Sequence, residues 1–286
     1  MFKTIIVGVR DVQAGRDAIA LAARLRAPED AVALLHVQVV TGRPAPDSGA
    51  VVGAAKRLTA LDRLTQLADE FAIAAEVACT EARSVRHGLH EFARRQNADL
   101  LVVRASELDE LGRDFIGDDT KDLLDDAPCA VAVAPAGYLA RAQPITRIGV
   151  AYDGSAGSEQ ALALARTLAA ERGAELSAFE AVSAPAYAHD PADVAGEWRQ
   201  RAVAARQRLA ALGGLEPDAR TGDAVDELAR HERSVDLLVI GAHKYGPTDH
   251  LLRASVSQRL ADDPAAPLLV LPPPSVSHRR ARSRRA

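Results

Sequence analysis

The residues best suited to chemistry lie in one strand–loop–helix segment, residues 236–257. Leu237–Ile240 is a wholly apolar run typical of a buried strand, Gly241 ends it, and a helix is expected to begin at Ser255 after a polar loop. In this geometry backbone N–H groups and the helix dipole face the end of the loop, where they favour an anion. The segment therefore predicts a phosphate-binding loop, and the rest of the chain must supply the sheet that positions it.

The composition favours helices packed on a parallel sheet. The chain has 286 residues, of which 48% are hydrophobic and only 3% aromatic, so its core must consist mainly of Ala, Leu and Val. Such a core suits the α/β class, and the length suits two domains. A net charge of −4 argues against a general nucleic-acid binder.

The ends of the chain and its cysteines bear on location. No apolar run is long enough to span a membrane, and the N-terminus enters a strand without a signal-peptide pattern. Cys79 and Cys129 are far apart and lack metal-ligand spacing, so we expect a cytoplasmic protein. Residues 275–286 include the basic run His278–Arg285, which predicts a disordered tail or, alternatively, a contact with an anionic partner.

An internal repeat divides the chain into two halves. Ala98–Val103 (ADLLVV) matches Val235–Ile240 (VDLLVI), and Ala18–Ala22 (AIALA) matches Ala161–Ala165 (ALALA). The proline-containing stretch Pro135–Pro144 is the natural boundary. We therefore predict one domain over 1–140 and a second over 141–274.

Each half is predicted to alternate five strands with helices, which implies a doubly wound parallel sheet. The expected strands are Thr4–Val9, Val32–Val39, Ala74–Cys79, Leu100–Val103 and Ala130–Ala134, then Ile148–Tyr152, Leu176–Val182, Ala219–Thr221, Leu237–Ile240 and Leu268–Leu271. The expected helices are Ala14–Leu25, one through Leu58–Leu67, Val85–Arg95, Ser158–Glu171, about Asp193–Leu212, and one capped near Asp223; residues 41–53 are expected to form a loop.

Two motifs carry a resemblance to a known family. Asp153-Gly154-Ser155 follows the first strand of the second half, and Gly241 and Ser255 match the ends of a G-x-x-G, nine residues, G-S/T pattern. With both halves covered, the chain resembles a tandem universal stress protein. The resemblance implies a Rossmann-like fold of the adenine nucleotide alpha hydrolase type. It also implies an intrachain pseudo-dimer in which the last strands, Val131–Ala134 and Leu268–Leu271, meet.

The resemblance also implies a nucleotide site in the second half, with ATP as the possible ligand. In nucleotide-binding members, an acid like Asp153 lies beside the adenosine, while the glycine loop and the terminal serine surround the ribose and phosphates. The matching positions here are Asp153, Gly241 and Ser255, with the N–H groups of Val256 and Ser257 at the helix start.

The second-half loop departs from the family pattern at two positions. Lys244 stands where the second glycine is expected, and Ala254 where the third is. A lysine is strained if the loop needs a positive φ there, but its ammonium could pair with a phosphate. The alternative is a loop that keeps the fold and has lost the ligand.

The first half departs further and is not expected to bind nucleotide. Arg10 occupies the position of Asp153, Arg104 and Glu107 replace the two glycines, and Asp118 replaces the serine. This half is interpreted as a structural partner of the second. Its acidic loop is expected to be a solvated face rather than a divalent-cation site.

Other candidate sites are weaker. His87 and His90 lie three apart on a helix but lack a third ligand nearby, and His243 and His250 flank the second-half loop. No nucleophile elbow, P-loop or Ser-His-Asp order is present, and no metal site is expected.

We therefore expect a non-catalytic protein of stress response or signalling with an unknown protein partner. ATP binding in the second half and formation of a homodimer are the hypotheses for its ligand and its assembly. No membrane or specific nucleic-acid partner is expected. The alternatives are a nucleotide-free interaction scaffold and a weak ATPase.

Overall fold

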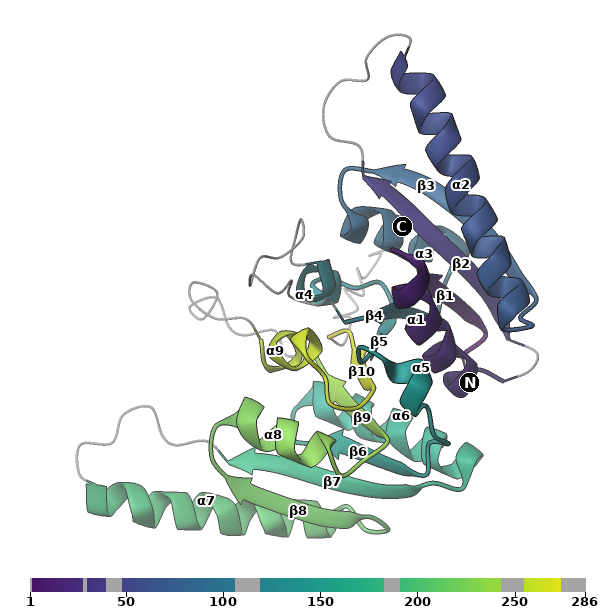
Figure 1. Cartoon of the computed structure of the whole chain (residues 1–286). Helices are drawn as coiled ribbons and strands as arrows, with labels where there is room; N and C mark the ends of the chain where they lie inside the picture. Colours follow the sequence, from purple (N-terminus) through teal and green to yellow (C-terminus); the bar gives the residue numbers. More distant parts are fainter. Residues whose placement is uncertain are drawn as a thin grey trace, which may run out of the picture.

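The structure, a computed structural model, describes residues 2–27, 30–39, 48–105, 119–182, 191–242 and 255–273. These residues form two α/β halves that share one sheet (Figure 1). Among them, no helix is both long enough and apolar enough to cross a membrane.

The first half contains five strands and four helices within the described residues. The strands are β1 (Thr4–Gly8), β2 (Ala31–Val39), β3 (Ala75–Ala82), β4 (Leu100–Arg104) and β5 (Ala130–Ala134). The helices are α1 (Val12–Leu25), α2 (Ser48–Glu70), α3 (Val85–Gln96) and α4 (Asp119–Leu124).

A short helix, α5 (Tyr138–Arg141), leads into the second half, which repeats the pattern. Its strands are β6 (Arg147–Ala151), β7 (Glu175–Val182), β8 (Glu216–Thr221), β9 (Leu237–Gly241) and β10 (Leu268–Leu271). Its helices are α6 (Ala156–Arg172), α7 (Pro191–Ala211), α8 (Ala224–Glu232) and α9 (Val256–Asp262).

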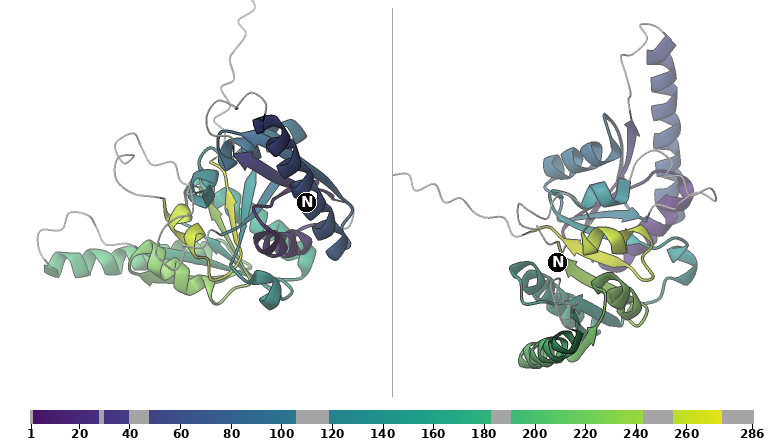
Figure 2. Two further views of the ribbon diagram at one scale, coloured as in Figure 1. Left: turned by 45° about the horizontal axis from the view of Figure 1, so that its top comes forward. Right: turned by 90° about the vertical axis from the view of Figure 1, so that its left-hand side faces the viewer.

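The two halves join through their last strands. The ten strands run in the order β3-β2-β1-β4-β5-β10-β9-β6-β7-β8. All pairs are parallel except β5 with β10, which are antiparallel, with Leu269 opposite Ala132. The expected meeting of the last strands is confirmed. It makes one continuous sheet, with α2 and α7 lying near its opposite ends (Figure 2).

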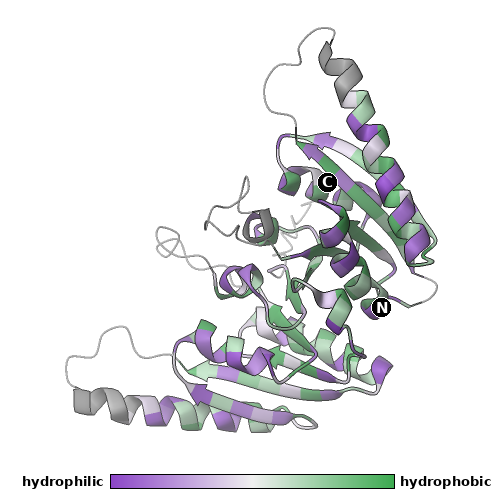
Figure 3. Cartoon of the chain, in the orientation of Figure 1, coloured by the Kyte–Doolittle hydropathy of each residue, from purple (hydrophilic) through white to green (hydrophobic). Residues whose placement is uncertain are grey.

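The side chains of alternating strand residues pack into two hydrophobic cores, one on each face of the sheet. Ile5 and Val7 pack on the face covered by α1, α2, α6 and α7, whereas Ile6 packs on the face covered by α3, α4, α8 and α9. The inner strands are accordingly apolar, whereas the edge strands β3 and β8 carry polar residues, and the outer faces of the helices are polar (Figure 3). Burial on both faces explains why the inner strand sequences are continuous apolar runs.

The expected elements are present, with one correction. The predicted loop 41–53 is wrong from residue 48 onward, because α2 begins at Ser48 and includes Gly53. The boundary stretch 135–144 contains the short helix α5, whose Tyr138 is buried. Asp223 caps α8 as predicted, accepting hydrogen bonds from the N–H groups of Val225 and Asp226.

Candidate functional site

A cavity of about 310 Å³ opens at the carboxyl ends of β6, β7 and β9. Such crevices are where open α/β sheets bind ligands. Asp153, Gly241, Ser255, Val256 and Ser257 all line it, although β6 and α9 are far apart in sequence. The fold therefore brings together these five predicted site residues. We call this space the second-half cavity.

Asp153 lies in a tight turn between β6 and α6. Its Oδ1 accepts a hydrogen bond from the N–H of Ser155 at 2.9 Å, and Gly154 takes a φ of 80°, a conformation that favours glycine. Ser155 then caps α6 by accepting from the N–H of Ser158. The Asp-Gly-Ser sequence is thus a turn and a helix cap that hold the exposed carboxylate of Asp153 at the edge of the cavity.

Ser255 begins α9 with a capping box. Its hydroxyl accepts from the N–H of Gln258 at 3.2 Å, and its own N–H donates to the Gln258 side chain at 2.7 Å. The hydroxyl of Ser257 lies 3.0 Å from that of Ser255. Val256 and Ser257 occupy the first two helical positions, whose N–H groups have no acceptor within a helix. The first turn of α9 therefore presents hydroxyl and N–H donors to the cavity.

Gly241 is required by packing, independently of any ligand. A Cβ at this position would lie 2.4 Å from the carbonyl oxygen of Gly157 in α6. No rotamer change relieves a clash between backbone atoms. The family resemblance places Gly241 in the loop around the ribose and phosphates; the structure gives the glycine a second reason, the contact between β9 and α6.

Two buried polar groups of the cavity were missed by the sequence argument. Glu180, in β7, is buried, and both its carboxylate oxygens accept from Arg208 of α7, with Nε to Oε2 at 3.0 Å. Tyr152 donates its hydroxyl to Glu159. Burial and this hydrogen bond raise the pKa of Tyr152 to about 12, so it stays a neutral donor. A glutamate inside an apolar strand was the available signal for Glu180.

The remaining wall of the cavity is apolar. Phe179, Leu228 and Ile240 line it, and the Phe179 ring stacks on His231 with centroids 4.6 Å apart. Burial lowers the pKa of His231, which keeps the imidazole neutral. An apolar wall beside carboxylates and a helix start combines the surfaces that an aromatic, anionic molecule requires.

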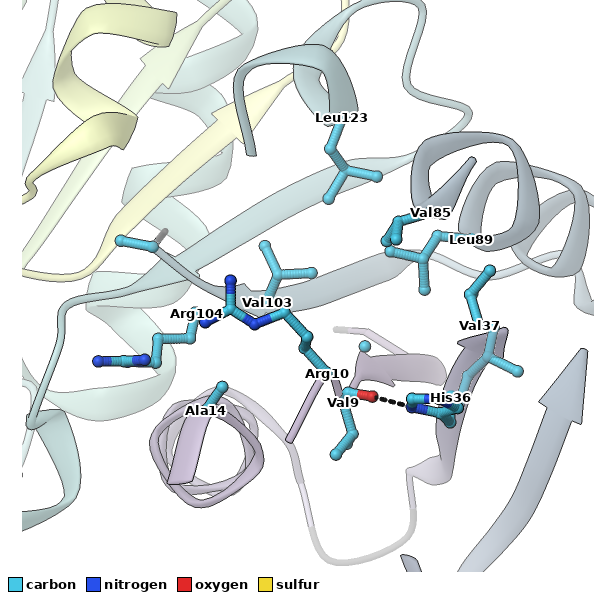
Figure 4. A pocket seen from close by; sticks show the side chains of 13 residues that line it. Val9, Arg10, Ala14, His36, Val37, Val85, Leu89, Val103, Arg104 and Leu123 are labelled. Atoms are coloured by element: carbon cyan, nitrogen blue, oxygen red, sulfur yellow. Dashed lines mark hydrogen bonds between the residues drawn. The ribbon is translucent and has the colours of Figure 1, made fainter. Parts of the chain in front are cut away.

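The corresponding space in the first half is nearly filled. It measures about 80 Å³ and is lined from β2, β4, α3 and α4 by apolar side chains, among them Val37, Leu89, Val103 and Leu123, with Arg10 and Arg104 also at its wall (Figure 4). We call it the small first-half cavity.

Arg104 is held there by a buried acid. Its Nε lies 3.2 Å from Asp17, and the two side chains are 6% and 0% exposed. Asp17 also accepts from the N–H groups of Gly137 and Leu139, each at 2.9 Å, and so ties α1 to the segment between the halves. The arginine that replaces the glycine is therefore part of the structure.

Other predicted positions have separate outcomes. Lys244, Ala254, Glu107, Asp118 and the tail 275–286 lie outside the described residues. His243 and His250 lie outside them as well. The ring of His90 is buried 2.9 Å from the carbonyl of Leu123, and His87 pairs with Glu91. Within the described ranges, no group of three His, Cys, Asp or Glu side chains could hold a metal ion.

Comparison with known proteins relates most of the chain to one family. The sequence model of the Universal stress protein family matches residues 1–135 and again 144–272. A universal stress protein from Archaeoglobus fulgidus is similar in structure, with a TM-score of 0.65 at 15% identity, over 94% of this chain and 98% of that one. A putative universal stress protein from Pseudomonas aeruginosa gives a TM-score of 0.60 at 16% identity, over 95% of this chain and 94% of that one. At sequence identities this low, the two structural matches support the fold and nothing about function.

Proposed function

The chain belongs to the universal stress protein family, in tandem form, and from this premise we propose that its second half binds an adenine nucleotide, with ATP as the expected ligand. One observation carries the proposal: Asp153, Gly241 and Ser255 line a single cavity at the carboxyl ends of the strands. These are the positions at which nucleotide-binding members, by resemblance, hold the ligand.

The chemistry of the cavity gives the ligand an orientation. The carboxylate of Asp153 is an acceptor for ribose hydroxyls, and the apolar wall with Phe179 suits the adenine ring. The first turn of α9, with Ser255 and Ser257, suits the phosphates, because donors and the positive end of the helix dipole favour negative charge there. The two carboxylates, Asp153 and Glu180, would repel phosphates, so the phosphates belong at the α9 end.

We propose binding rather than catalysis. The acids of the cavity are engaged: Glu180 with Arg208, and Asp153 with the N–H of Ser155. On this view the nucleotide acts in a stress or signalling role, and the two free thiols, Cys79 and Cys129, support a reducing, cytoplasmic location.

Calorimetry tests the proposal. ATP titrated into the full chain should bind, whereas Asp153→Ala and Ser255→Ala should each weaken binding at least tenfold; Glu216→Ala, which changes an exposed acid outside the cavity, should not. Chromatography of denatured protein should release adenine nucleotide if the ligand co-purifies. Absence of heat at millimolar ATP would favour the nucleotide-free scaffold, and undiminished binding in both cavity variants would place the site elsewhere. Phosphate release lost in the double variant would indicate an ATPase.

A further inference from the structure

We propose that the first half holds a separate binding site for a small organic acid, in a cavity of about 440 Å³ between the ends of β1 and β2 and the helix α2. We call it the α2 cavity. Its volume lies within the range of about 300–1,000 Å³ that is usual for small-molecule sites. The occupant is a molecule with one anionic group, carboxylate or phosphate, on a short apolar body.

The α2 cavity is distinct from the space that corresponds to the nucleotide site. That corresponding space is the small first-half cavity, lined from α3 and α4. The α2 cavity is lined by α2 and by the start of α1, and the two spaces share only Val9, Arg10 and His36 among their lining residues. The side chains that nearly fill the small first-half cavity therefore do not occupy the α2 cavity, which stays open.

The periodicity of α2 explains why a cavity exists there. Lys56, Ala60, Arg63, Leu64 and Leu67 recur at helical spacing and share one face of the helix. In the last turns of α2 this face is core, since Leu64 and Leu67 are almost fully buried. Toward the N-terminus the same face carries the small Ala60 and two long cations in place of large apolar residues, so the space against the sheet stays open.

The charges around the α2 cavity are mainly positive. Arg10, Lys56 and Arg63 line it, against the single carboxylate of Asp11. That carboxylate is already used: it caps α1 by accepting from the N–H of Ala14 at 2.8 Å and lies 3.2 Å from Arg10. Burial alone would raise the pKa of Asp11, but the hydrogen bond from Ala14 and the charge of Arg10 bring it below its usual value. Lys56 and Arg63 thus leave an excess of positive charge.

The floor of the α2 cavity is apolar. Val9, Val12, Leu64 and Leu67 line it beneath the charged side chains. An acid with a short apolar body fits both surfaces, because its carboxylate lies between Lys56 and Arg63 while its body displaces water from the floor. A triphosphate would place further negative charge beside Asp11 and leave the floor unused.

The probes are hexanoate, hexyl phosphate and neutral hexanol, measured with the full chain by ligand-observed NMR and calorimetry at low salt. We expect hexanoate or hexyl phosphate to bind at least tenfold more tightly than hexanol, and which of the two is tighter identifies the anionic group. The Lys56→Gln/Arg63→Gln double variant should lose at least tenfold in affinity. Arg57→Gln, which removes a charge from the same helix outside the cavity lining, should retain it.

A further variant tests whether the ligand occupies the α2 cavity, independently of the charges of Lys56 and Arg63. Ala60→Phe places a phenyl ring in the α2 cavity without altering any charge and should weaken binding at least tenfold, whereas Ser255→Asp, in the second half, should leave it unchanged. The proposal is overturned if hexanol binds as well as the acids, or if the double variant and Arg57→Gln bind alike. Retention of binding in Ala60→Phe would equally exclude the α2 cavity as the site.

Discussion

At the scale of single residues, one buried acid lies away from all three cavities. Glu232, at the end of α8, is 1% exposed. One carboxylate oxygen accepts from the N–H of Ala265 at 3.1 Å, and in the described part of the chain the other has no partner. Burial raises the pKa of Glu232 to about 7, so near neutral pH the folded protein holds a proton that the unfolded chain releases.

This proton makes stability depend on pH. Between pH 4.5, the ordinary value, and about 7, the unfolded chain ionises first, so stability falls as pH rises and levels off above pH 7. Glu232→Gln removes this dependence. Relative to the wild type, the variant should gain about 2–3 kcal/mol of unfolding free energy between pH 5 and pH 8. Urea unfolding at both pH values measures this difference in unfolding free energy, with the exposed Glu216→Gln as control. If the difference between Glu232→Gln and the wild type were the same at pH 5 and pH 8, the raised pKa of Glu232 would be refuted.

Gly241 gives a second prediction at this scale. Because a Cβ there would collide with the backbone of Gly157, Gly241→Ala should destabilise the fold by about 2 kcal/mol or more. Gly53 is the matched control, since it lies inside α2 with no atom within 4 Å of an added Cβ. Gly53→Ala should stabilise by roughly 0.5–1 kcal/mol. Thermal unfolding compares the two, and equal effects would contradict the packing role of Gly241.

At the scale of elements, sequence reasoning located strands better than long-range partners. The predicted bounds of two strands, Leu100–Val103 and Leu268–Leu271, agree with β4 and β10 to within one residue. A strand that is buried on both faces has an uninterrupted apolar sequence, which is easily recognised. The start of α2 was missed, since Gly and Pro near residue 48 suggest a loop. The Arg104–Asp17 pair was also missed, because a single sequence does not reveal which distant charges meet.

The same limit applies to the candidate site. The motif predicted that Asp153, Gly241 and Ser255 lie together, and they line one cavity. Glu180 and Arg208 were not predicted, because their pairing depends on how α7 crosses β7. The packing role of Gly241 likewise depends on where α6 approaches β9.

The pair Arg104–Asp17 joins β4, α1 and the segment between the halves, and it carries a prediction of its own. Asp17→Asn leaves a buried guanidinium without its counter-charge and should lower the unfolding free energy by about 3 kcal/mol or more. The control is Glu70→Gln, which makes the same acid-to-amide change in the exposed pair of Glu70 with Arg16. It should lower the unfolding free energy by at most about 0.5 kcal/mol. Chemical denaturation distinguishes them; similar losses would show that the buried pair has no special role.

At the scale of the whole molecule, the halves have diverged while the sheet keeps their symmetry. The continuous sheet, with its antiparallel β5–β10 pair, makes one chain equivalent to a dimer. Within it, the second half keeps a cavity of about 310 Å³ where the first keeps about 80 Å³. The small first-half cavity is enclosed mainly by apolar side chains, among them Val37, Leu89 and Leu123, with Arg10 and Arg104 at its wall. We therefore expect one nucleotide per chain, although the chain contains two family domains.

The most direct test is the stoichiometry and charge dependence of ATP binding, measured by calorimetry on the wild type and on Ser255→Asp. Aspartate is as good a helix cap as serine, so the variant should unfold at nearly the wild-type temperature. Its carboxylate faces the proposed phosphate position, so affinity should fall at least tenfold, a loss of about 1.4 kcal/mol or more. We expect one ATP per wild-type chain and this selective loss; two ATP per chain, or equal affinity in the variant, would contradict the proposed site.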